Sequence, residues 1–290
     1  MKTARIGLAL LFIALLMGGP TLAQKNKKTA KTDVKENTET KPVKPTEALI
    51  TVTTMHRNLN KTDGSRAEWL ALEKEFFDKV TNKNPLVLGA NVLTHYFTED
   101  NSEILIVHAY ANWEDIEKAF DKNNELIKAG WPNESERRAF FKKRNSYYAE
   151  NHSDEIYQTI PGSKMMKTKP DKSMLYYVRK SHFAYPEDGS EKDFTVLFNK
   201  YIEAVTYKND VIKAYYPHVH AWGANSTEFT EVFVVDELAD VEKMFDKDDE
   251  LFKASWPDEG KQREFDDAFN KYFIGTHSDY IYRSVPELIK

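Results

Sequence analysis

The chain has 290 residues, with 41 basic and 46 acidic side chains, 11 glycines and no cysteine. The absence of cysteine excludes disulfides, a thiol nucleophile and a lipid-modified cysteine anchor, and so few glycines leave little room for loops that cradle nucleotides. Residues 47–290 carry 32 basic against 43 acidic groups, a net charge of about −11. Such a body repels phosphate backbones, so nucleic acid is excluded as a partner.

The first 23 residues have the pattern of a secretory signal peptide. Lys2 and Arg5 form its positive end, residues 6–17 its apolar run, and Thr21-Leu22-Ala23 a cleavage site of small residues. The apolar run is too short to span a bilayer, and no second run follows, so we expect no transmembrane segment. We predict a secreted or periplasmic protein that is cleaved after Ala23. Residues 24–46, rich in Lys, Thr and Pro, predict a disordered linker.

The rest of the chain repeats itself at an offset of 125 residues. Residues 239–257 match residues 114–132 at 12 of 19 positions, and His152-Ser153-Asp154 returns as His277-Ser278-Asp279. No insertion is needed to align the two copies, which we place at 47–161 and 172–290. A repeat of this length predicts a duplicated domain rather than a solenoid of short units.

Each copy predicts the element order β-α-β-β-α-α-β. The first copy has a strand at 49–57, a helix at 67–80, a hairpin of strands at 86–98 and 103–110, helices at 113–129 and 134–150, and a last strand at 155–160. The second has the corresponding elements at 174–182, 192–205, 211–223, 228–235, 238–254, 259–274 and 280–285. The order predicts an α+β fold of two tandem ferredoxin-like repeats. Because the uncovered face of each antiparallel sheet can be buried on the other copy, we expect the sheets to close into a pseudo-dimeric α/β barrel.

Over roughly residues 47–286 this element order and duplication resemble the dimeric α/β-barrel superfamily. That superfamily includes antibiotic-biosynthesis-monooxygenase-like, NIPSNAP-like and stress-responsive barrel domains. The resemblance implies oxidation of a phenolic substrate without a bound cofactor, with His and Tyr as acid-base groups. It also implies haem as a variant, with a His as the axial ligand.

Alternation along the strands places a candidate site on the inner face of the predicted barrel. If the second hairpin turns about Asn225 and Ser226, His220 lies opposite Glu231 and His218 opposite Phe233. For the enzymatic activity that the resemblance implies, His220 is the expected catalytic base, oriented by Glu231. The predicted ligand-binding side chains on the same inner face are Tyr216, Trp222, Phe233, His95, Phe97, His108 and Tyr110.

Two imidazoles and a carboxylate are also a ligand set for Zn²⁺ or Fe²⁺, which makes His218, His220 and Glu231 a candidate metal site. The same residues can instead form an ordinary ion pair in a filled core. No cofactor is identified by the sequence: we expect none, with metal or haem as alternatives. The leading interpretation is an exported barrel that binds a small molecule in an aromatic and His-lined lumen. The alternatives are a monooxygenase-like, or metal- or haem-dependent, oxidoreductase acting on a small aromatic substrate, and a non-catalytic envelope stress or interaction protein.

Overall fold

The computed structural model describes residues 48–290, so the predicted signal peptide and linker lie outside the described residues. The first half of the described chain contains β1 (Leu49–Arg57), α1 (Arg66–Lys79), β2 (Gly89–Phe97), β3 (Glu103–Tyr110), α2 (Trp113–Gly130), α3 (Glu134–Asn145) and β4 (Tyr148–Thr159). The second contains β5 (Leu175–Phe183), α4 (Glu191–Tyr201), β6 (Ala214–Trp222), β7 (Glu228–Val235), α5 (Ala239–Ser255), α6 (Glu259–Asn270) and β8 (Phe273–Ser284). Short helical turns lie at Thr81–Lys83, Ile202–Thr206 and Pro286–Leu288.

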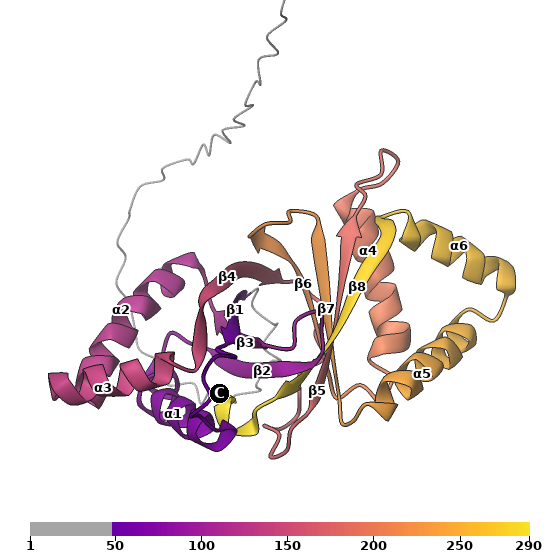
Figure 1. The fold of residues 1–290 in the computed structure, drawn as a ribbon. Coiled ribbons are helices and arrows are strands. Elements are labelled where there is room, and N and C mark those ends of the chain that lie inside the picture. Colours follow the sequence, from indigo (N-terminus) through magenta and orange to yellow (C-terminus); the bar gives the residue numbers. More distant parts are fainter. Residues whose placement is uncertain (1–47) are drawn as a thin grey trace, which may run out of the picture. The chain divides into compact units, whose positions relative to one another are not determined.

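The strands pair antiparallel in the cyclic order β1-β3-β2-β8-β5-β7-β6-β4, and β4 pairs with β1. Two seams join the halves, β2 with β8 and β4 with β6. Helices α1, α2 and α3 lie on one side of the strands, and α4, α5 and α6 on the other (Figure 1). Among the helices of residues 48–290, none combines the length and apolarity needed to cross a bilayer.

Three large apolar clusters lie on the two sides of the strands, two of them beneath the helices and one inside the barrel. One packs strand residues such as Ile104 against α1 and α2, and a second packs residues such as Phe229 and Phe233 against α4 and α5. The third joins both halves inside the barrel: Leu93, Leu105, Met174, Tyr176, Val178, Ala214, Val234 and Tyr282. Because these side chains fill the middle of the barrel, a ligand can enter the interior only towards its ends.

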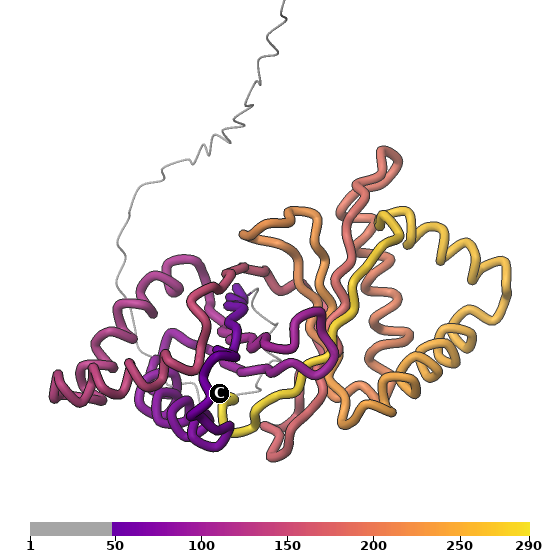
Figure 2. Tube along the Cα trace, in the orientation of Figure 1, coloured from indigo at the N-terminus to yellow at the C-terminus, as the bar shows by residue number. Residues whose placement is uncertain are grey.

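Each half ends with a segment that packs on the other half. After β8, the backbone N–H of Lys290 donates to Ala90 O at 2.9 Å, and Val285 and Leu288 join the core under α1. After β4, Lys164 pairs with Tyr215 of β6. Figure 2 follows the yellow C-terminal segment from the second half to α1. The segments after β4 and β8 therefore each connect one half to the other by backbone pairing.

The last strand of each half is longer than predicted, because β4 begins at Tyr148 and β8 at Phe273. Residues 151–154 are exposed and polar, a pattern that resembles a loop, yet His152 pairs with Met55 and Asp154 with Thr53 of β1. The first strands differ in register: β1 and β5 begin 126 residues apart, whereas β3 and β7 begin 125 apart. The prediction of an alignment without insertion is therefore wrong by one residue in the segment between these strands.

Candidate functional site

The predicted register of the β6–β7 hairpin is wrong. His218 pairs with Thr230, and Pro217 with Glu231. Residues 223–227 lie between the strands, close to the predicted bounds, but the pairing is centred on Ala224 and not between Asn225 and Ser226. Gly223 has a φ of +145°. The pairing differs by three positions, and an odd shift moves every side chain of a strand to the opposite face. Glu231 therefore lies on the helix-facing side, where Tyr215 Oη donates to its Oε1 at 2.5 Å.

The metal site predicted at His218, His220 and Glu231 does not form, because Glu231 and the imidazoles lie on opposite faces of the sheet. Within residues 48–290, no group of three or more His, Asp or Glu side chains is placed to hold a metal ion. The Glu231 position also rules out its predicted role of orienting His220.

The predicted ligand-binding residues are dispersed. Phe233 and Tyr110 belong to the helix-facing cores, and His108 shares that outer face because it pairs with Ala90. For these three residues the predicted inner face is wrong, for the same reason of hairpin register. Trp222 and Phe97 are 69% and 55% exposed at strand ends, Tyr216 packs at the edge of the interior cluster, and His95 lines a cavity.

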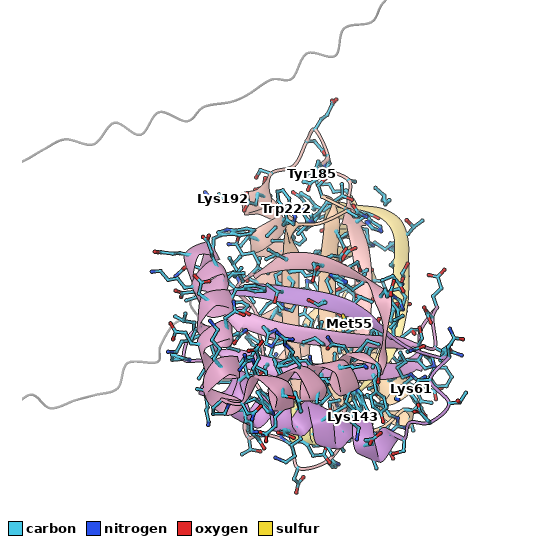
Figure 3. The ribbon with its side chains drawn as sticks, turned by 60° about the vertical axis from the view of Figure 1, so that its left-hand side comes forward. Met55, Lys61, Lys143, Tyr185, Lys192 and Trp222 are labelled. Atoms are coloured by element: carbon cyan, nitrogen blue, oxygen red, sulfur yellow. The ribbon has the colours of Figure 1, made fainter. Side chains whose placement is uncertain are left out.

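A partly buried polar cluster does occupy the barrel end near β6 and β7, and we call Lys180, Glu155, Tyr157 and Glu228 the Lys180 cluster. Tyr157 Oη lies 2.6 Å from Glu155 Oε2 and 2.6 Å from Glu228 Oε1. Lys180 Nζ lies 3.0 Å from Glu228 Oε1 and 3.1 Å from Tyr157 Oη. His218 stacks edge-on beside Tyr157, with 6.3 Å between the ring centres. Figure 3 places Trp222 near this end, towards the top of the view, and Lys61 near the opposite end.

The electrostatics of the Lys180 cluster are those of a satisfied ion network. Burial acts to lower the pKa of Lys180, but Glu228 and Glu155 outweigh it and the pKa is raised. Burial acts to raise the pKa of Glu228, and Lys180 and Tyr157 reverse the effect. Burial together with Glu228 raises the pKa of Tyr157. The two carboxylates therefore already have a cation and a phenol as partners, which leaves them poorly suited to act on a substrate.

Part of this arrangement recurs at the other end of the barrel, without the lysine. Tyr282 Oη donates to Glu103 Oε2 at 3.2 Å, and these two residues stand 125 positions from Tyr157 and Glu228. Leu105 of β3 and Thr230 of β7 are equivalent at the offset of 125 residues. Lys180 of β5 pairs with Thr230, whereas the residue of β1 that pairs with Leu105 is Thr54. Glu103 thus has a phenol partner but no ammonium group corresponding to Lys180.

Glu103 faces a cavity of about 670 Å³, which we call the Glu103 cavity. It lies between the loop before α1, the adjoining ends of β2 and β3, and β8. Its apolar and aromatic walls include Trp69, Ile104 and Tyr147, and His95 also lines it, with its Nδ1 2.8 Å from Thr98 Oγ1. The basic residues of the lining are Arg57, Lys61, Arg66 and Arg283. The volume is in the range of small-molecule sites.

The cavity does not fit a haem group. Its lining carries three arginines and a glutamate around one histidine, whereas a macrocycle needs two largely apolar walls and an axial ligand between them. We therefore derive no chemistry through haem.

Sequence reasoning missed Glu103, Glu228, Lys180 and the arginines of the Glu103 cavity. A signal was present, since Glu103 and Tyr282 recur as Glu228 and Tyr157 at the repeat offset. Their contact could not be inferred, however, because each pair joins the start of one strand to the end of another across the seam between the halves.

The fold is an eight-stranded antiparallel barrel with helices outside it, and the predicted resemblance to dimeric α/β barrels is confirmed at the level of fold alone. No protein-family model matches the chain, and no curated protein matches its sequence. A Fusobacterium nucleatum protein provisionally assigned as a monooxygenase shares 11% identity, with a TM-score of 0.53 over 83% of this chain and 93% of its own. A protein provisionally assigned as a chlorite dismutase shares 15% identity, with a TM-score of 0.48 over 84% and 97% of the two chains. A single-substitution variant of the chlorite dismutase of Candidatus Nitrospira defluvii shares 11%, with a TM-score of 0.47 over 84% and 93%.

Proposed function

We propose that this protein is a monooxygenase-like oxidoreductase whose Glu103 cavity takes a small aromatic substrate. The observation that carries the proposal is a carboxylate held by a tyrosine, Glu103 with Tyr282, at the wall of a cavity of about 670 Å³. The equivalent carboxylate of the Lys180 cluster, Glu228, instead forms an ion pair with Lys180. The fold shared with a protein provisionally assigned as a monooxygenase is consistent with this reaction class.

The chemistry proposed is oxidation of an activated aromatic CH₂ to C=O by O₂, with release of one water. Glu103 removes a proton from the substrate, and the resulting carbanion is the electron source for O₂. Tyr282 holds the carboxylate in position, and Trp69 and Tyr147 exclude water from the ring of the substrate. Proton transfer to a positioned carboxylate contributes about 10²- to 10⁴-fold in rate.

Oxygen uptake by the purified full chain with a panel of anthrones, including carboxylated ones, tests the proposal. We expect turnover that falls about 10²-fold in Glu103→Gln, as for removal of a general base. The matched control is Glu228→Gln at the corresponding position, which should keep the rate while losing stability. Absence of turnover across the panel, or equal rates in wild type and Glu103→Gln, would reject the enzymatic function.

Binding without turnover is the second candidate function, and the ligand-sized, polar and aromatic cavity itself favours it. It predicts retention of an aromatic compound by both wild type and Glu103→Gln, with no oxygen uptake. A chain that retains no aromatic compound would leave the structural or interaction role as the remaining interpretation.

We also propose that the chain arose by duplication of one domain and that it is exported. The 12 identities in 19 positions and the repeated element order support two tandem copies, whose sheets form one barrel. Lys2, Arg5, the apolar run and Ala23 support export as a secreted or periplasmic protein. N-terminal sequencing of the exported chain should begin at Gln24; an uncleaved chain retained in the cytoplasm would contradict export.

A further inference from the structure

The basic residues of the Glu103 cavity carry charge that the protein itself leaves unbalanced. Lys61 pairs with Asp63 at 2.7 Å. Arg57, Arg66 and Arg283 have no carboxylate within ion-pair distance among residues 48–290. Arg57 donates to Asn101 O at 2.6 Å, and the Arg283 guanidinium lies 4.0 Å from the ring centre of Tyr96. These contacts hold Arg57 and Arg283 in place without neutralising their charge.

This positive lining stands on an acidic body. Residues 47–290 have a net charge of about −11, and several surface lysines elsewhere are in ion pairs, such as Lys74 with Asp78 and Lys253 with Asp249. In the cavity three arginines meet a single lining carboxylate, Glu103, which already accepts from Tyr282. A guanidinium offers a fork of donors that matches the two oxygens of a carboxylate, and a cavity lined mainly by one sign of charge concentrates the opposite sign.

We infer that the Glu103 cavity selects an aromatic anion, with the acidic group held by Arg57, Arg66 and Arg283 and the ring lying against Trp69 and Tyr147. The inference rests on the proposed function, because it names the substrate class of the same site. Glu103 itself disfavours an anion directly beside it, so the acidic group must lie towards the arginines and leave the carbon skeleton near the carboxylate. The arginines are therefore specificity-determining residues and Glu103 the reacting group.

The test compares an acid with its uncharged isostere by isothermal titration calorimetry on the full chain. We expect 2-naphthoate to bind at least tenfold more tightly than 2-naphthamide, and more weakly as salt rises. Arg283→Gln and Arg57→Gln should each weaken 2-naphthoate about three- to tenfold while leaving 2-naphthamide unchanged. The control is Arg263→Gln, an exposed arginine of α6 beside Glu259, which should change neither affinity.

Equal binding of the acid and the amide would overturn the inference, as would unchanged acid binding in both arginine variants. It would also be overturned if benzoate, 4-hydroxybenzoate and 2-naphthoate all failed to bind, or if inorganic phosphate bound as tightly as the aromatic acids. Measurement of turnover distinguishes failure of this inference from failure of the proposed function. Acid-selective binding without oxygen uptake rejects the enzymatic function and supports the anion site. Oxygen uptake without acid selectivity supports the enzymatic function and rejects the anion site.

Discussion

His218 lies 8% exposed in the barrel interior, and burial lowers its pKa from 6.5 to about 4. Between these values the unfolded chain binds a proton that the folded chain excludes. The stability from this histidine is therefore complete above about pH 6.5 and is lost as the pH falls towards 4, a total of about 3 kcal/mol. We expect wild type to lose about 2 kcal/mol more than His218→Gln between pH 7 and pH 5.

Urea unfolding at the two pH values measures this difference. The control is Asn151→Gln, an exposed uncharged residue of β4, which should keep the wild-type pH dependence. Burial also lowers the pKa of His108 to about 4, so part of the wild-type loss remains in His218→Gln. Identical pH dependence in wild type and His218→Gln would show that the ring is hydrated in the folded state.

At the scale of single elements, a buried asparagine fixes the loop before β2 and again the loop before β6. Asn84 donates to Ala119 O at 3.0 Å and to Asn123 Oδ1 at 2.8 Å, and it accepts from the backbone of Leu86. Asn209 makes the same contacts with Met244 O at 2.9 Å and Asp248 Oδ1 at 2.8 Å. Each amide therefore ties a strand entry to the helix that packs above it.

Replacement of these asparagines by aspartate separates the two sites. In Asn84→Asp the Asn123 amide can turn and donate, so we expect a loss of about 2 kcal/mol. In Asn209→Asp two carboxylates face each other at pH 8, and we expect a loss of about 4 kcal/mol. Because burial raises the pKa of Asp248 to about 6, a proton can enter the pair near pH 5 and narrow the gap. Urea unfolding of both variants at pH 8 and pH 5 checks this; equal losses at pH 8 would contradict it.

The helices and strands could be predicted from the sequence. Which strand residues face the helices and which face the barrel interior could be predicted only in part. Alternation along β6 placed Tyr216, His218 and His220 on one face, the face on which Tyr216 meets the interior cluster. The partner strand β7 was assigned the wrong face, because the sequence does not reveal that the pairing of the two strands is centred on Ala224. Glu228 and Lys180 approach each other from neighbouring strands of the same half, yet Tyr157 reaches them across the seam. Such contacts depend on the closure of the sheet, which periodicity along one strand does not encode.

At the scale of the whole molecule, the two halves share one interior and should unfold together. Leu105 of the first half and Met174 of the second belong to the same cluster, and the segments after β4 and β8 each pack on the opposite half. Leu105→Ala and Met174→Ala should each cost about 2 to 5 kcal/mol, and each should shift the entire transition. Far-UV circular dichroism and tryptophan fluorescence should then give coincident curves in both variants, since a half without its partner leaves the interior cluster open to water. Two separate transitions, with Leu105→Ala shifting only one of them, would instead mean that each half is stable with the inner face of its sheet uncovered. The burial of the shared cluster argues against that outcome, since Leu93 is only 4% exposed and Tyr282 only 5%.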